Sequence, residues 1–164
     1  MGRVEGRLRK LGLTLPASLK PPTGTAFPFQ FVRIVGTRAL IAGHGPQLID
    51  GSMAGPLGKL GRELSVEDGY RAARLTALSI LGSLERALGT LDRITAWARV
   101  FGMVNSAPGF NSQPTVINGF SDLILDVFGP VVGSHSRSAV GMAELPFNIP
   151  VEIEGEVEIA PAGT

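Results

Sequence analysis

The stretch RITAWARVFGMV, residues 93–104, decides the fold. After Arg93 nearly every position is apolar, with larger side chains on one alternating set and smaller ones on the other. A β-strand over 94–104 with two apolar faces is typical of a strand inside a sheet. We therefore expect helices to cover one face of this sheet and a second layer to cover the other.

Two helices are predicted to supply the first layer. The segment SVED, residues 65–68, has the form of a capping box with Asp68 in place of the usual Glu or Gln. A helix that starts there should end at Gly89, a typical C-terminal glycine. The spacing of apolar residues predicts a second helix over 112–128, which the segment GPVVGSHS should end.

The remaining strands frame these helices. Two apolar runs flank the turn-like pair Gly36-Thr37, so we expect a β-hairpin of Phe29–Val35 and Arg38–Gly43. A glycine-rich loop follows, with a short strand at 47–49. Two further strands are expected over 137–145 and 150–160.

The element order β-β-α-β-α-β-β predicts an α+β fold, with a mixed sheet and two helices packed on one face. We expect residues 1–26, a short helix at 3–12 and a proline-rich lead-in, to form an N-terminal extension before a single domain over 27–164. One chain has enough helix to cover only one face of the sheet. A homo-oligomer is the simplest source of cover for the other.

Composition excludes several classes of function. The 164 residues include no cysteine, so disulfides and thiolate metal sites are excluded. A net charge of +1 gives no electrostatic reason to expect a nucleic acid partner. Because the start is not signal-like and no apolar run has membrane length, we expect a cytoplasmic protein with no membrane contact. The two histidines, His44 and His135, have no metal-site spacing, and we interpret His135 as a loop residue and expect no metal.

One pair of residues remains as a candidate site. Arg137 starts one strand and Glu152 starts the next, and the connection GMAELPFNIP suits a hairpin-like link between antiparallel neighbours. Arg137 offers a planar fork for a carboxylate, and Glu152 offers a base or a water-holder. The alternative is that all four alternating glutamates, Glu152, Glu154, Glu156 and Glu158, form only a solvated face.

The C-terminal segment RSAVGMAELPFNIPVEIEGEV, residues 137–157, resembles the signature of the RidA family, also called YjgF-like or L-PSP endoribonuclease. The segments ALIAGHGPQ (39–47) and TVINGFSDLILDVFG (115–129) also resemble that family and occur in the right order. The resemblance covers roughly residues 27–160. It implies a chorismate-mutase-like α+β chain in a homotrimer, with clefts between subunits.

For the function, the resemblance implies hydrolysis of reactive enamines and imines to 2-oxo acids and ammonia without a cofactor. By position in the motifs, Arg137 would bind the substrate carboxylate and Glu152 would hold the water. Backbone groups at Ala139 and Gly43 would approach the substrate nitrogen side. The remaining expected substrate-binding positions are Asn118, Phe29 and His44. Phe29 replaces the tyrosine of the family and His44 replaces its glutamine, so the rim of the site is altered.

Two other functions stay open. The same cleft in a non-catalytic trimer could bind small carboxylates or a protein partner. Endoribonuclease activity, which the family name suggests, is disfavoured because the chain is nearly neutral and has no stripe of basic and aromatic residues. The preferred partner is a small substrate that carries a carboxylate.

Overall fold

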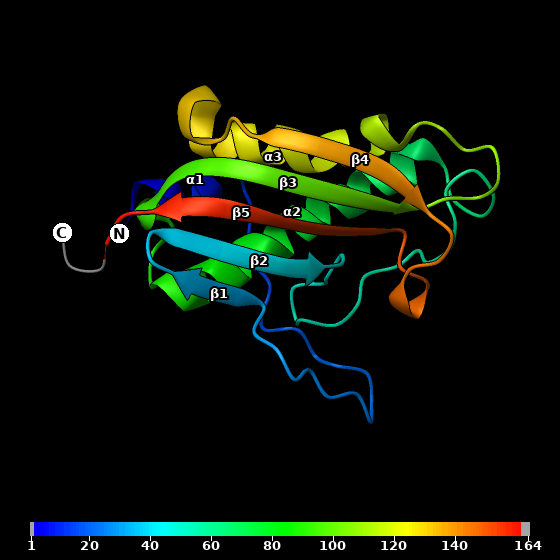
Figure 1. Ribbon diagram of the computed structural model, residues 1–164, viewed down its shortest axis with the longest axis horizontal. Helices are drawn as coiled ribbons and strands as arrows, with labels where there is room; N and C mark the ends of the chain where they lie inside the picture. Colours follow the sequence, from blue (N-terminus) through cyan, green and yellow to red (C-terminus); the bar gives the residue numbers. More distant parts are fainter. Residues whose placement is uncertain (1, 162–164) are drawn as a thin grey trace.

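The computed structural model describes residues 2–161 and has a five-stranded mixed sheet at its centre. The strands run in the order β1-β2-β5-β3-β4. They are β1 (Val32–Val35), β2 (Arg38–His44), β3 (Ile94–Asn105), β4 (Ser136–Met142) and β5 (Val151–Ile159). Figure 1 shows the sheet in front of its helices, so one face is covered and the other is open. The α+β prediction, with helices on one face, is confirmed.

Local signals set the bounds of helix α2 (Val66–Leu88). The Ser65 side chain accepts a hydrogen bond from the Asp68 backbone, and the Asp68 carboxylate accepts one from the Ser65 backbone. At the other end Gly89 adopts a left-handed conformation with φ 82°. Both predicted ends of this helix are confirmed.

Helix α3 (Gln113–Val132) extends beyond its predicted end at residue 128. Gly129 has non-helical angles (φ 78°, ψ 173°) and kinks the chain, and one further turn follows from Pro130. By length and composition α3 could cross a membrane, with a mean hydropathy of 1.4. Its buried side chains, among them Phe120 and Leu123, instead pack in the core against α2 and β3.

Helix α1 (Arg3–Lys10) joins the same core through Val4 and Leu8. Its N-terminus is capped from outside the helix, because the Asp92 carboxylate accepts hydrogen bonds from the backbone of Arg3 (2.6 Å) and Val4 (2.8 Å). The boundary between an extension (1–26) and a domain (27–164) stays a prediction.

The predicted pairing of the last two strands is wrong. Strand β3 lies between them, parallel to β4 and antiparallel to β5. Helix α3 forms the crossover that places β4 parallel to β3. The connection from β4 to β5 then passes β3 and returns to the middle of the sheet.

The first strands match the predicted hairpin with shorter bounds. Strand β1 begins at Val32 rather than Phe29, and the segment before it loops away from the body of the molecule (Figure 1). The predicted strand at 47–49 is reduced to one bridge between Gln47 and Met53.

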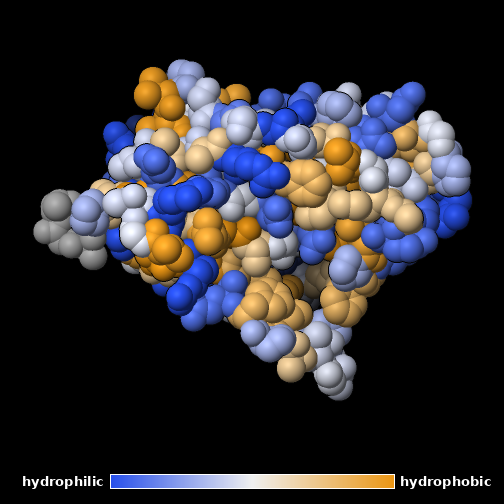
Figure 2. All heavy atoms as spheres, in the orientation of Figure 1, coloured by the Kyte–Doolittle hydropathy of each residue, from blue (hydrophilic) through white to orange (hydrophobic). Residues whose placement is uncertain are grey.

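The open face of the sheet mixes charge with apolar side chains, as Figure 2 shows. Arg38 pairs with Glu156, and Arg99 lies 3.8 Å from Glu154. Apolar side chains on this face are exposed or half-buried: Leu40, Phe101, Met103 and Val140. The second apolar face expected for β3 is therefore open to solvent in a single chain.

Candidate functional site

Arg137 points toward the helices from the edge strand β4. Its partner on β3 is Val100, a fully buried residue of the helix-facing side, and partners across a ladder share a face. The guanidinium is held by α3: Nη1 donates to Asn118 Oδ1 and to Ser121 Oγ, both at 3.0 Å. Nη2 donates to the carbonyl of Pro114 at 3.2 Å.

His135 lies in the loop between α3 and β4, as predicted, and its ring joins this group. Its Nδ1 lies 2.7 Å from the Gly133 carbonyl, so Nδ1–H donates there. Its Nε2 can then accept from Ser121 Oγ at 2.9 Å. Burial lowers the pKa of His135, the bond to Gly133 partly offsets this, and the charge of Arg137 lowers it further. The ring is therefore neutral at pH 7.

These four residues, Asn118, Ser121, His135 and Arg137, form what we call the arginine cluster. They line a cavity of about 260 Å³ together with Leu125 and Ser134. Ala139 lies two residues after Arg137 on the same, helix-facing side of β4 and is partly buried against the core. Structure thus brings together Arg137, Asn118 and Ala139 among the predicted residues, and adds Ser121 and His135.

Glu152 lies on the other face of the sheet. Its partner on β3 is Met103, three residues from the partner of Arg137, and an odd step along a strand changes the face. Burial raises the pKa of the Glu152 carboxyl, and the nearby charge of Glu154 raises it further. Among residues 2–161, no Arg, Lys or His lies within ion-pair distance of this carboxylate.

Gly43 lies directly against Glu152. A Cβ added to Gly43 would lie 2.6 Å from Glu152 Oε1 and 2.9 Å from its Cδ. The absence of a side chain is what lets the carboxylate lie over β2 at this point. Two separately predicted site residues, Gly43 and Glu152, therefore touch, and we call this the Gly43–Glu152 contact.

His44 and Phe29 lie apart from that contact. The His44 ring is buried on the helix side, where Nδ1 donates to the Ala42 carbonyl and Nε2 accepts from Ser83 Oγ. Burial lowers its pKa to about 4. Phe29 is half-exposed and stacks edge-on with Phe27 and Phe31, and the Phe31 ring contacts His44.

The arginine cluster and the Gly43–Glu152 contact do not form one site within a single chain. They lie on opposite faces, two strands apart and three residues out of register, which places the Cα atoms of Arg137 and Glu152 about 14 Å apart. No group of three or more His, Asp or Glu residues that could hold a metal ion occurs in the described part of the chain.

Comparisons with known proteins agree on one family. Residues 5–153 match the family model described as "YjgF/chorismate_mutase-like, putative endoribonuclease". The chain is 42% identical over 161 residues to Protein TCP17 of Trypanosoma cruzi, covering 96% of this chain and 95% of that protein.

Two solved structures are also similar. Atu1372 of Agrobacterium tumefaciens, a protein of unknown function, is 40% identical with a TM-score of 0.85, over 96% of this chain and 92% of that one. A protein of Shewanella oneidensis MR-1, described as a "putative endoribonuclease", is 31% identical with a TM-score of 0.86, over 96% and 100%.

Proposed function

Since this chain belongs to the YjgF/chorismate mutase-like family, we propose that it hydrolyses enamines and imines of amino acids to 2-oxo acids and ammonia. The proposed site lies in a cleft between copies of the chain in a homotrimer. The observation that carries the proposal is the division of the candidate groups. Arg137, held by α3, and Glu152, whose pKa is raised, occupy opposite faces of one sheet.

A composite site between two copies would bring the arginine cluster and the Gly43–Glu152 contact together. The arginine cluster of one copy would face the Gly43–Glu152 contact of the next, so that substrate lies between them. Exposed apolar side chains on the open face, including Leu40 and Val140, support contact with another copy. A cyclic trimer would form three such sites with one interface.

The chemistry needs little beyond these groups. Substrate has the form R–CH₂–C(=NH)–COO⁻, and Arg137 would bind its carboxylate through the fork that Asn118 and Ser121 hold in place. Glu152 would take a proton from a water that attacks C2 and pass it to the imine nitrogen, and its raised pKa makes it a stronger base than an ordinary carboxylate. Collapse of the resulting carbinolamine breaks the C–N bond and gives R–CH₂–CO–COO⁻ and NH₃.

The family description also raises ribonuclease activity, which the charges of this chain disfavour. The open face carries four glutamates, and two of its arginines pair with them: Arg38 with Glu156 and Arg99 with Glu154. A surface of this kind offers few free cations to a phosphate backbone.

Subunit complementation tests the proposal. Arg137→Gln and Glu152→Gln chains are purified separately, and each should hydrolyse imines poorly. Equal amounts are then unfolded and refolded together. If each site takes Arg137 from one copy and Glu152 from the next, each mixed trimer regains one complete site in three, which is about a quarter of all sites after random assembly.

The readout is 2-oxo acid release, corrected for spontaneous hydrolysis, with sedimentation equilibrium to give the mass. Recovery near a quarter of wild-type activity supports the composite site. No recovery in mixed trimers contradicts the division of the site between copies. Full activity in both single variants contradicts the deaminase function and leaves a module that binds small carboxylates.

A further inference from the structure

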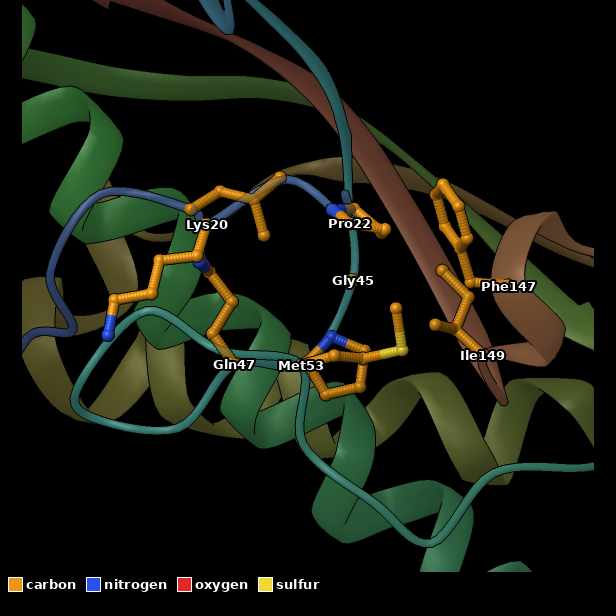
Figure 3. A pocket seen from close by; sticks show the side chains of 9 residues that line it. Lys20, Pro22, Gly45, Gln47, Met53, Phe147 and Ile149 are labelled. Atoms are coloured by element: carbon orange, nitrogen blue, oxygen red, sulfur yellow. The ribbon is translucent and has the colours of Figure 1, made fainter. Parts of the chain in front are cut away.

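A second cavity, of about 260 Å³, opens beyond the end of β2 (Figure 3), and we call it the side cavity. Three separate segments form it: the lead-in before β1, the loop after β2 and the turn before β5. The lining residues are Leu19, Lys20, Pro22, Gly45, Pro46, Gln47, Met53, Phe147 and Ile149. Figure 2 shows the molecule hollowed at this place on the open side of the sheet.

The walls of this side cavity are mostly apolar. Its two long polar side chains are engaged elsewhere: Lys20 Nζ lies 3.2 Å from an Asp50 carboxylate oxygen, and Gln47 Nε2 donates to the Gly51 carbonyl. Most of what remains toward the cavity is carbon and sulfur, from leucine, proline, methionine, phenylalanine and isoleucine. Such a cavity selects an apolar group.

Phe147 is an unusual residue for this position. Its ring is 49% exposed, and its backbone lies in the left-handed region with φ 57° and ψ 17°. That conformation is uncommon for any residue with a side chain and strained for a bulky one. This bulky apolar side chain is half-exposed at the rim of the cavity and is therefore accessible to a ligand there.

The side cavity lies next to the Gly43–Glu152 contact. Gly43 and Gly45 are two residues apart on β2 and its continuation, and in extended chain such residues face the same side. A Cβ on Gly43 would meet Glu152 Oε1 at 2.6 Å, and one on Gly45 would meet Ile149 Cδ1 at 2.9 Å. The two glycines are about 7 Å apart along the chain, so the carboxylate and the cavity wall lie at neighbouring points on one strip of backbone without side chains.

From this juxtaposition we propose that the side cavity binds the side chain of the substrate, and that the preferred substrates are imines with large apolar side chains. This inference rests on the proposed hydrolysis at Glu152. An isobutyl or benzyl group attached to the imine carbon extends several atoms farther toward the cavity, as in the imines of leucine and phenylalanine. The methyl of 2-iminopropanoate, or the methylene of its enamine 2-aminoacrylate, does not reach the cavity.

The test compares imines made from L-phenylalanine, L-leucine and L-alanine by an L-amino-acid oxidase. We expect kcat/KM for the phenylalanine and leucine imines to exceed that for the alanine imine by about 10–100-fold. Met53→Trp should fill the cavity and Phe147→Ala should remove its rim. Each should lower kcat/KM for the large imines about tenfold and leave the alanine imine unchanged. Val131→Ala, at a side chain that is 87% exposed at the end of α3, is the matched control and should change neither.

Failure of this inference and failure of the proposed function give different results. If the alanine imine is hydrolysed as fast as the large imines, or if Met53→Trp lowers all rates equally, the side-chain site is wrong and the hydrolase stands. If no imine is hydrolysed, calorimetry with phenylpyruvate and pyruvate decides whether the side cavity binds the side chain of a ligand. Tighter binding of phenylpyruvate that Met53→Trp abolishes supports the cavity as a binding site, and equal binding of the two acids overturns it.

Discussion

Replacing Gly43 by alanine should move the Glu152 carboxylate without disturbing the fold. The new Cβ would lie 2.6 Å from Oε1, and an ordinary contact needs 3.4 Å, so the carboxylate must shift by about 0.8 Å. The group that moves is the end of a flexible side chain. Gly43 does not occupy the left-handed region, so alanine fits its backbone. We therefore expect the free energy of unfolding to change by less than about 1 kcal/mol.

The effect on rate should be much larger than the effect on stability. A misplacement of about 1 Å at a reacting group costs on the order of 10²-fold in rate. Gly43→Ala should accordingly lower kcat/KM for imine hydrolysis by roughly 10²-fold, although no atom of the proposed catalytic residue is removed. The assay follows 2-oxo acid release from an enzymatically generated imine, with spontaneous hydrolysis subtracted.

Two controls separate this from a general effect of adding a methyl group. Gly6, inside α1, has no atom within 4 Å of its added Cβ, so Gly6→Ala should leave the rate unchanged and stabilise by about 0.5–1 kcal/mol. In a Glu152→Gln background, Gly43→Ala should lower kcat/KM little further, because both changes act through the side chain at residue 152. The reasoning is refuted if Gly43→Ala keeps wild-type kcat/KM while Glu152→Gln does not, or if its cost is undiminished in the double variant.

Three further outcomes follow from contacts in the structure. The folded pKa of Glu152 is raised above 4.5, so ionisation of this carboxyl destabilises the fold as the pH rises above 4.5. Glu152→Gln should therefore raise the melting temperature at pH 7 and not at pH 4. Equal shifts of the melting temperature at both pH values would contradict this. Ser121→Ala removes one acceptor from Arg137 and should weaken pyruvate binding by about 1 kcal/mol, roughly fivefold by calorimetry; unchanged affinity would place the anchor elsewhere. Asp92→Ala should destabilise by about 1 kcal/mol in urea unfolding by uncapping α1, and faster amide exchange confined to α1 would locate the effect.

Local signals are sufficient for helix α2 and for the turn of the hairpin. The capping box at Ser65 and the glycine at residue 89 are short-range devices, so the sequence predicts both ends of α2 correctly. The kink at Gly129 was also visible as a break, but the extra turn after Pro130 was not. Proline fits the first turn of a new helical segment as well as it ends an old one.

The strand order could not be predicted by the same reasoning. The connection GMAELPFNIP is long enough for a hairpin or for a step over one strand, and only the crossover through α3 decides between them. The error matters for the site, because it placed Arg137 and Glu152 side by side in one chain. Their separation onto two faces follows from pairing with β3, which is a non-local fact.

The role of His135 was hidden for a related reason. Its partner Ser121 lies 14 residues away on α3, so the contact depends on how α3 packs against β4. A signal was nevertheless present. His135 and Arg137 are two residues apart in extended chain, and Asn118 and Ser121 are three apart on a helix, so each pair shares a face. Glu152 differs from Glu154 and Glu156, each of which pairs with an arginine, and its catalytic role stays a prediction.

The buried imidazole of His44, which lies next to Gly43 on β2, makes the stability of this protein sensitive to acid. Its pKa is lowered from 6.5 to about 4, so the unfolded chain takes up a proton before the folded one does. Stability is complete above pH 6.5 and is lost as the pH falls toward 4, by about 3 kcal/mol in all. Protonation would expel the ring from beneath the end of β2 and loosen its neighbour Gly43. Because the folded ring takes up its proton only near pH 4, the proposed hydrolysis should be lost as the pH falls toward 4 and should persist under mildly acidic conditions.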